Sequence, residues 1–270
     1  MKLTLDITQS VQENASAYFE KAKRLKQKMK GAEEGLVLVR EKLAHVETES
    51  QKIQSTSPLL RRKKEWFEKF HWCYTTNGLL LVGGRDAHSN ESLIKRHMEE
   101  KDWYFHADVH GAPHCLLKEG KLSAKKEDME QAASFAGVFS SVWKKGLFSV
   151  RVYAVSPEQV TKKAPSGESL GKGAFMIYGS REWFDPRLSM GVGVQDTPAG
   201  LRVMGGPLSC IQTHCRHLME IVPGEKSKAE VAKSYARFLQ GKGVESSSLL
   251  LDEIMGALPN GLLALKPVLN

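Results

Sequence analysis

A seven-residue repeat of apolar positions runs through the N-terminal part of the chain. Steps of four and three residues alternate between its apolar or small members, which are Val11, Ala15, Tyr18, Ala22, Leu25, Met29, Ala32, Leu36, Val39, Leu43 and Val46. This period is typical of the seam of a coiled coil, so we expect one helix that ends near residue 50. Ser10 and Glu13 have the spacing of a capping box at its start.

A second, shorter helix is predicted at residues 58–70, starting at Pro58. It is too short to cover the seam of the first helix. An uncovered apolar stripe of that length favours aggregation. The seam therefore requires another partner, which could be an upstream segment, a second copy of the chain or a different protein.

Beyond residue 70, short apolar runs alternate with turns and with helical periods. Strands are predicted at 71–76, 79–83, 102–107, 114–118, 147–155, 174–178, 189–194, 201–204 and 217–222, and helices at 86–98, 124–140, 207–214, 226–240 and 247–256. This mixture predicts an α+β (mixed α/β) fold. A Gly- and Pro-containing stretch at 191–207 is predicted to separate two units. We expect a coiled-coil arm at 1–57, a mixed-sheet domain at 58–195 and a small α/β C-terminal extension at 196–270.

Charge narrows the classes of partner. The chain has 270 residues and a net charge of +8, which favours an anionic partner. The first helix carries a run of cations, Lys21, Lys23, Arg24, Lys26, Lys28 and Lys30, which is either a solvated face or a track for phosphates. No apolar run approaches the ~20 residues of a membrane span. Four scattered cysteines fit reduced thiols, so we expect a cytoplasmic protein with no membrane partner.

Hydrogen-bonding side chains are concentrated between residues 85 and 118. Metal binding is one explanation, but the histidines 106, 110 and 114 fall on different predicted elements, and neither CxxC nor HExxH spacing occurs. A second set, Cys210, His214, Cys215 and His217, is more typical of buried side chains. Asp108 and His110 could orient a base, but no nucleophile has a spacing that requires one. We therefore expect no metal, cofactor or catalytic residue.

Phosphate contact is the third explanation. The glycine pair 83–84 precedes a predicted helix and lets backbone N–H groups approach an anion, although Asp86 could cap that helix instead. Strand alternation places His106 and Asp108 on one face. We therefore expect Arg85, Asp86, His106, Asp108 and His110 to converge at one edge of the main sheet.

The same stretch resembles the RNA-binding domain of the NFACT family. The residues that carry the resemblance are Gly83, Gly84, Arg85, Asp86, Asn90, Glu91, Lys95, Arg96, Asp102, Tyr104, His106, Ala107, Asp108, His110, Gly111, Ala112 and Lys118. Residues 162–184 are similar to a later segment of that family, and residues 10–28 are similar to one strand of its coiled-coil arm.

The resemblance implies a ribosome quality-control factor. Such a factor binds the large ribosomal subunit with peptidyl-tRNA after stalling, contacts rRNA and tRNA, and supports tRNA recruitment and C-terminal tailing of nascent chains. The residues expected to contact RNA are Arg85, Asp86, Asn90, Lys95, Arg96, His106, Asp108, His110 and Lys118, with Lys21, Arg24 and Lys28 on the first helix. The alternatives are a coiled-coil protein-interaction module without RNA binding and a metal-dependent RNA-processing enzyme.

The chain departs from the family pattern in several places. The family's N-terminal half is missing, so we expect a fragment or one half of a split protein, which pairs through the coiled coil with that half or with a second copy. Tyr178 and Ser180 replace the Arg and Lys that relatives carry. Near the C-terminus, Lys226, Ser227 and Lys228 begin a predicted helix, where they form either an anion site or an ordinary cap.

Overall fold

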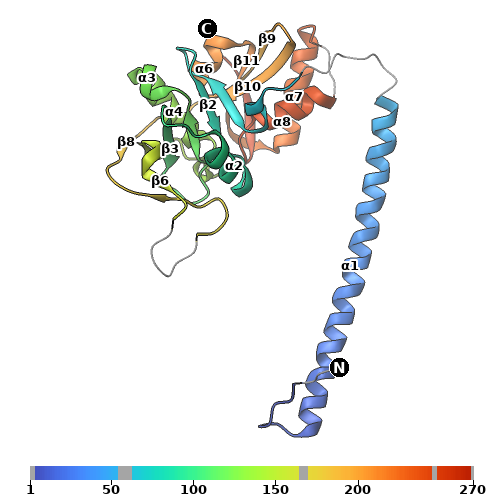
Figure 1. Cartoon of the computed structure of the whole chain (residues 1–270). Helices are drawn as coiled ribbons and strands as arrows, with labels where there is room; N and C mark the ends of the chain where they lie inside the picture. The colour runs from blue at the N-terminus through green and yellow to red at the C-terminus, as the bar shows by residue number, and fades with distance from the viewer. Residues whose placement is uncertain (1–3, 54–62, 164–169, 245–247, 269–270) are drawn as a thin grey trace. The chain divides into compact units, whose positions relative to one another are not determined.

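The computed structural model describes residues 4–53, 63–163, 170–244 and 248–268 (Figure 1). Its contacts divide the chain into two units, Met1–Arg61 and Arg62–Asn270. No helix in the described residues is long and apolar enough to cross a membrane.

The first unit is built on one long helix, α1 (Val11–Ile53), which confirms the prediction of a single helix. The predicted capping box is present, because the Ser10 N–H donates to Glu13 Oε2 at 2.7 Å and the Glu13 N–H donates to Ser10 Oγ at 3.3 Å. Asn14 is buried at its start, where its side chain accepts from the Asp6 N–H at 2.8 Å. The residues before α1 therefore fold back onto its first turns.

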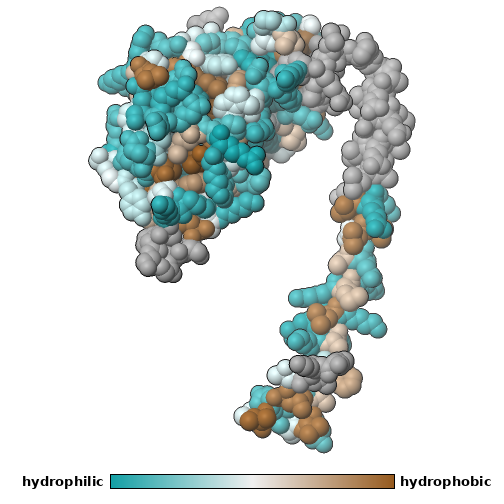
Figure 2. Space-filling model, viewed as in Figure 1, coloured by the Kyte–Doolittle hydropathy of each residue, from teal (hydrophilic) through white to brown (hydrophobic). Residues whose placement is uncertain are grey.

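Much of the apolar seam of α1 is exposed among the residues of this unit that the structure describes. Val11, Leu25, Met29, Leu36 and Val39 are each more than half exposed. Apolar patches follow one another along the helix in Figure 2. The side chains of two further predicted seam positions, residues 43 and 46, lie outside the described residues. The seam predicted from the sequence is thus available to a partner.

The helix predicted at 58–70 is wrong where the structure describes it. Residues 58–62 lie outside the described part. Residues 63–65 are not helical, and Glu65 has an extended backbone with ψ of 154°. Only Trp66–Lys69 forms a single 3-10 turn, η1. Both Phe67 and Phe70 are buried, so one turn suffices to place both rings in the core.

The second unit begins with a six-stranded sheet whose pairings are all antiparallel. Its strand order is β1-β2-β4-β3-β5-β8. The strands are β1 (His71–Tyr74), β2 (Leu80–Gly83), β3 (Trp103–Ala107), β4 (Cys115–Leu117), β5 (Val152–Val155) and β8 (Glu182–Phe184). A separate two-stranded sheet joins β6 (Val160–Thr161) to β7 (Met176–Ile177), after the short 3-10 turn η2 (Pro157–Gln159).

Helices pack beside this sheet. They are α2 (Ala87–His97), α3 (Gly120–Ser123), α4 (Lys126–Val138) and α5 (Ser141–Lys144). The helix α4 contacts β2, β3, β4 and β5, and nearly all of its residues from Met129 to Val138 are buried. It is therefore the central helix of the core, and Phe135 is its largest fully buried side chain.

A second, four-stranded antiparallel sheet has the order β10-β9-β11-β12. Its elements are β9 (Met190–Thr197), β10 (Gly200–Gly206), α6 (Leu208–His214), β11 (Arg216–Lys226), α7 (Lys228–Gly241), α8 (Ser248–Ala257) and β12 (Leu263–Pro267). The predicted separator at 191–207 is wrong, because those residues form most of the β9–β10 hairpin.

The two sheets share a core. Met204, Cys210 and Ile211 belong to the same apolar cluster as Cys73 and Phe135. A Cβ atom at Gly206 would lie only 2.7 Å from the Cys73 sulfur, so the absence of a side chain there lets β10 approach β1. The longer predicted helices are confirmed within a few residues, whereas β8, β12 and the short helices α3 and α5 were not predicted.

We expect Leu25→Asp to abolish self-association or partner-helix binding while the second unit stays folded. The seam position is exposed, and a carboxylate there cannot be buried against another apolar helix without a large desolvation cost. Sedimentation velocity measures the association, and near-ultraviolet circular dichroism measures the fold of residues 62–270.

Gln27→Asp is the matched control, because this exposed residue lies two positions from Leu25 and so on the opposite face of α1. It should leave association intact. Loss of the second unit's melting transition in Leu25→Asp alone would mean that α1 packs internally.

Candidate RNA-binding surface

The polar residues at the start of α2 form hydrogen bonds with one another. Asp86 accepts the Ser89 N–H at 2.7 Å, and Ser89 Oγ accepts the N–H groups of Arg85 and Asp86 at 2.8 and 2.9 Å. Asp86 is thus the N-cap of the helix, as the local alternative predicted.

Asn90 ties α2 to the strand beside it. Its side-chain oxygen accepts the His114 N–H at 3.0 Å. A Cβ atom at Gly84 would overlap that same oxygen, so only glycine leaves room for it. The glycine therefore serves the fold at this position, and the Asn90 oxygen is already used within the protein.

The His114 ring continues the connection into a distant segment. Its Nδ1 accepts from the Tyr104 hydroxyl, and its Nε2 donates to the Gly173 carbonyl at 2.7 Å. Gly173 has φ of +77°, and a Cβ atom there would lie 2.7 Å from the Ala87 carbonyl oxygen. The segment around Gly173 is thereby held against the start of α2.

Glu91 holds the same segment from the other side. It accepts the Gly173 N–H at 2.9 Å and pairs with Lys95 at 2.6 Å and Lys162 at 3.5 Å. The Lys95 hydrogen bond, followed by the Gly173 N–H, lowers the pKa of Glu91 to about 2. The charge of Lys95 is therefore already compensated within the protein.

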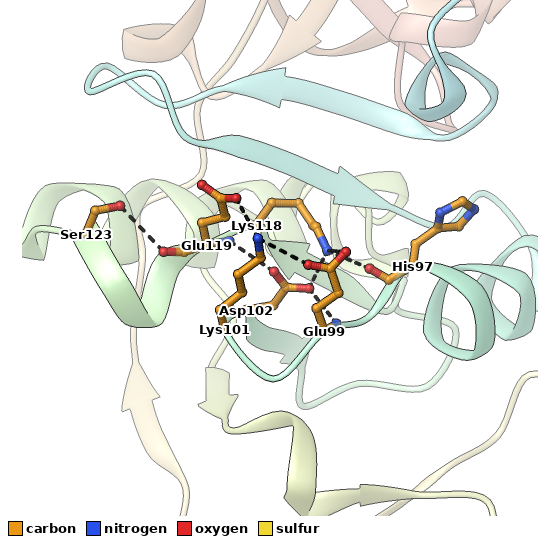
Figure 3. A network of polar contacts seen from close by, with 7 residues as sticks. All are labelled: His97, Glu99, Lys101, Asp102, Lys118, Glu119 and Ser123. Carbon is orange, nitrogen blue, oxygen red and sulfur yellow. Dashed lines mark hydrogen bonds and ion pairs between the residues drawn. The ribbon is translucent and has the colours of Figure 1, made fainter.

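Lys118 is the centre of a polar network at the start of β3 and the end of β4 (Figure 3). Its Nζ lies 2.6 Å from Asp102 Oδ2 and donates to the His97 carbonyl at 2.6 Å. Asp102 is fully buried and also accepts the N–H groups of Glu99 and Glu119 at 2.8 and 3.0 Å. Removing Lys118 would leave the buried Asp102 carboxylate without its nearest cation, so the pair serves the fold first.

Gly83 at the end of β2 and Phe105 within β3 both pair with Cys115, so the two strands lie in register on either side of β4. The side chains that follow have separate partners. The Arg85 guanidinium donates to the Phe70 carbonyl at 2.9 Å, whereas His106 Nδ1 donates to the Pro113 carbonyl at 2.9 Å. The contacts therefore do not support the predicted convergence of Arg85 with His106.

Arg85 instead lies near Lys228 at the start of α7. Burial, and then the charge of Arg85, lower the pKa of Lys228 to about 8. Ser227 caps α7 in a capping box with Glu230, so the ordinary cap is present there. The structure thus brings two cations together from segments that the sequence analysis treated separately.

Several predicted RNA contacts remain exposed. Asp86, Arg96, Asp108 and His110 all face solvent. The Asp108 N–H donates to the Arg151 carbonyl at 2.8 Å, which places Asp108 beside β5. On α1, Lys21, Arg24 and Lys28 are exposed at positions that share one face of the helix.

The candidate metal sets do not assemble in the part of the chain that the structure describes, where no group of three potential metal-binding His, Cys, Asp or Glu side chains occurs. His106 and His114 stack with ring centroids 4.9 Å apart, but both ring nitrogens of His114 are used. In the second set, His214 donates to the Thr75 carbonyl at 2.6 Å.

The sequence analysis missed an aromatic and cationic cluster on β8. Arg181 and Trp183 are exposed there, and Arg151 reaches the same place from the start of β5. The alternation of Arg181 and Trp183 is the only signal in the sequence, and a strand of three residues is too short for that period to be recognised.

Comparison with known families decides the nature of the domain. Residues 69–179 match the family described as "NFACT protein RNA binding domain". The chain contains an NFACT RNA-binding domain. It begins inside η1 and covers the whole network of Asn90, Glu91, His114 and Gly173.

Named relatives align with more residues of the chain than the family match covers. The chain is 33% identical over 192 residues to the archaeal Rqc2 homolog aRqcH of Methanocaldococcus jannaschii, which covers 71% of this chain and 28% of that protein. It is 32% identical over 182 residues to the ribosome quality control complex subunit NEMF of Homo sapiens, which covers 66% and 17%. The chain therefore spans less than a third of the length of these relatives.

A solved structure also aligns with the chain. It is the C-terminal part of the fibronectin/fibrinogen-binding protein from Streptococcus suis (FBPS), which is 19% identical with a TM-score of 0.39 and covers 67% of this chain and 77% of that chain.

We expect Asn90→Ala to destabilise the NFACT domain by about 1–3 kcal/mol, because the buried His114 N–H would lose its acceptor. Urea denaturation followed by tryptophan fluorescence measures the change. His88→Ala, at an exposed position on the same helix, should change the unfolding free energy by less than about 0.5 kcal/mol. An equally stable Asn90→Ala variant would contradict the role assigned to this hydrogen bond.

We expect the free energy of unfolding to decrease as the pH is lowered from the ordinary pKa of histidine, near 6.5, to pH 4. Burial, followed by the charge of His106, lowers the pKa of His114 to about 4. The folded protein therefore keeps this ring neutral while the unfolded chain takes up the proton, which costs about 3 kcal/mol by pH 4. The unfolding free energy measured in urea from pH 7 to pH 4 should fall by that much more in the wild type than in His114→Gln.

His88→Gln is the control for this pH series, because its ring is exposed on α2. It should keep the full wild-type pH dependence. A His114→Gln profile parallel to that of the wild type would show that another group is responsible.

Proposed function

We propose that this chain is the RNA-binding part of a ribosome quality-control factor. It would bind the large ribosomal subunit with peptidyl-tRNA after stalling, through rRNA and tRNA, and would support tRNA recruitment and C-terminal tailing of nascent chains. The observation that carries this proposal is the match of residues 69–179 to the NFACT RNA-binding domain. The names of the relatives, which include a ribosome quality control complex subunit, support the process.

The distribution of charge supports an RNA partner. The net charge of +8 is accompanied by an exposed row of cations on α1, Lys21, Arg24 and Lys28. Neutralising phosphates with such cations releases counterions and drives association with RNA. Working on ribosomes would place the protein in the cytoplasm.

The exposed seam of α1 supports a second role alongside RNA binding. Leu25, Met29 and Leu36 form an apolar stripe that fits another amphipathic helix. We propose that this stripe receives the N-terminal half of an NFACT protein or a second copy. A pure protein-interaction module, with the basic charge serving only solubility, is the competing function that the experiment below separates.

We also propose that the chain catalyses no reaction of its own. In the described residues no hydrogen bond joins Asp108 to His110, the pair considered for a base, and the neighbouring histidines are used in the fold, since His106 donates to the Pro113 carbonyl and His114 bonds to Tyr104 and Gly173. In the family it resembles, the new peptide bonds are made by the ribosome.

We expect the triple reversal of Lys21, Arg24 and Lys28 to Glu to weaken binding to purified large ribosomal subunits without lowering the melting temperature. Removing three phosphate contacts should reduce the log–log salt slope by about 2, at about 0.7 for each phosphate of a single strand. Co-sedimentation across a salt series measures both the affinity and the slope.

Reversal of Lys233, Arg237 and Lys242 to Glu is the matched control, because it changes the charge equally at exposed positions on α7 and at its C-cap. It should bind nearly as well as the wild type. A flat salt dependence of the wild type would exclude the RNA proposal and leave the protein-interaction module.

A further inference from the structure

The open edge of the six-stranded sheet carries a row of aromatic side chains. In the register of β3, β5 and β8, His106 pairs with Tyr153, and Tyr153 pairs with Trp183. Directly paired residues point to the same face of a sheet. The ring centroids of His106 and Tyr153 are 5.9 Å apart, and those of Tyr153 and Trp183 are 5.4 Å apart. The row becomes more exposed toward the edge, from buried Tyr153 to Trp183, which is 39% exposed.

Two arginines cross over this row. Arg151 lies two residues before Tyr153, and Arg181 lies two residues before Trp183, so both arginines share the face of the rings. Because β5 and β8 are antiparallel, each arginine reaches the ring on the neighbouring strand. Arg151 Cζ lies 4.4 Å from the centre of the Trp183 ring, and Arg181 Cζ lies 4.5 Å from the centre of the Tyr153 ring.

The guanidinium groups are not neutralised by close carboxylates. Arg151 has a single long ion pair, 3.8 Å to Asp185, between two exposed side chains, and such a pair contributes little. Arg181 has no ion pair with any carboxylate that the structure describes. Glu182 alternates to the opposite face of the strand. The face of the rings is therefore cationic at this edge.

The position of the two arginines over the rings determines which of their surfaces a ligand can reach. A guanidinium held flat against a ring keeps its second face open and its N–H donors free at its rim. Unpaired bases stack on aromatic rings and guanidinium planes, and the same N–H donors fit phosphate oxygens. No described strand pairs with the outer edge of β8, so the row is open on that side.

We propose that Trp183, Arg151 and Arg181 form a stacking site for unpaired bases of single-stranded RNA. The proposal rests on the RNA-binding function proposed above and names the chemistry of a contact within it. It extends the exposed surface at Asp108, whose backbone lies beside Arg151, to the edge of the sheet.

The test uses the full chain and a fluorescently labelled single-stranded oligoadenylate, with binding measured by fluorescence anisotropy. Trp183→Ala should weaken binding by about 5- to 150-fold, the range measured for losing one base–aromatic stack. Its salt slope should stay unchanged, because no phosphate contact is lost. Trp183→Phe should restore most of the affinity, and a labelled duplex RNA of equal length should not distinguish Trp183→Ala from the wild type.

Trp66→Ala is the matched control, because Trp66 is 38% exposed but stacks on His97, and none of the described arginines lies over its ring. It should bind within about twofold of the wild type. If Trp183→Ala melts early, Arg181→Lys provides the test, since it keeps the charge but loses the planar face and should still weaken binding severalfold.

Two outcomes would overturn the stacking site. One is a pattern of oligoadenylate affinities that does not single out this site. Trp183→Ala and Trp66→Ala would then lose affinity equally, or neither Trp183→Ala nor Arg181→Lys would lose affinity although the wild type binds. The other is weaker binding of Trp183→Ala to ribosomal subunits with unchanged oligoadenylate binding, which would indicate a ribosomal protein partner. Failure of the wild type to bind either RNA or ribosomal subunits would instead refute the proposed function.

Discussion

The hydrogen bond from the His114 N–H to the Asn90 side chain is the contact on which the NFACT domain of this chain depends. It requires glycine at position 84, because any side chain there would occupy the place of the Asn90 oxygen. It also sets the position of the His114 ring, which reaches the Gly173 carbonyl at 2.7 Å. Through its backbone N–H and its ring, the buried His114 thus connects α2 and the start of β4 to a segment more than fifty residues away in sequence.

This constraint changes how the family's signature residues are understood. Asp86 caps α2, Glu91 holds Gly173, and Lys118 neutralises the buried Asp102. Each of these polar residues has its partner within the domain, and breaking the Lys118–Asp102 pair would leave a buried carboxylate without its nearest cation. Their spacing in the sequence therefore reflects the assembly of the domain as well as any contact with RNA.

In the proposed function, RNA contact would be left to the exposed groups that the domain and α1 present. The α1 cations offer an electrostatic contact that depends on salt, while the aromatic row at the β8 edge offers stacking that does not. The first would supply affinity for any RNA, and the second would select unpaired bases. The apolar seam of α1 would serve a different kind of partner in this proposal, because its exposed leucines fit another helix.

The sequence determined the parts that rest on local periodicity. The long helix α1 and its seam followed from a repeat sustained over many turns, and the helices α2, α4, α6, α7 and α8 from apolar periods with turn signals beside them. The family followed from separated motifs in order. The helix at 58–70 was mispredicted because its aromatic residues have helical spacing. The single 3-10 turn at Trp66–Lys69 is already enough to bury Phe67 and Phe70.

The tertiary structure alone decided which polar side chains meet. Arg85 bonds to the Phe70 carbonyl and lies near Lys228, while His106 bonds to the Pro113 carbonyl, because strands in register can still send their side chains to different neighbours. Likewise, Arg151 and Arg181 come to lie over Trp183 and Tyr153 only through the pairing of β5 with β8. Strand register joins residues distant in the chain, and no local pattern in the sequence encodes that distance.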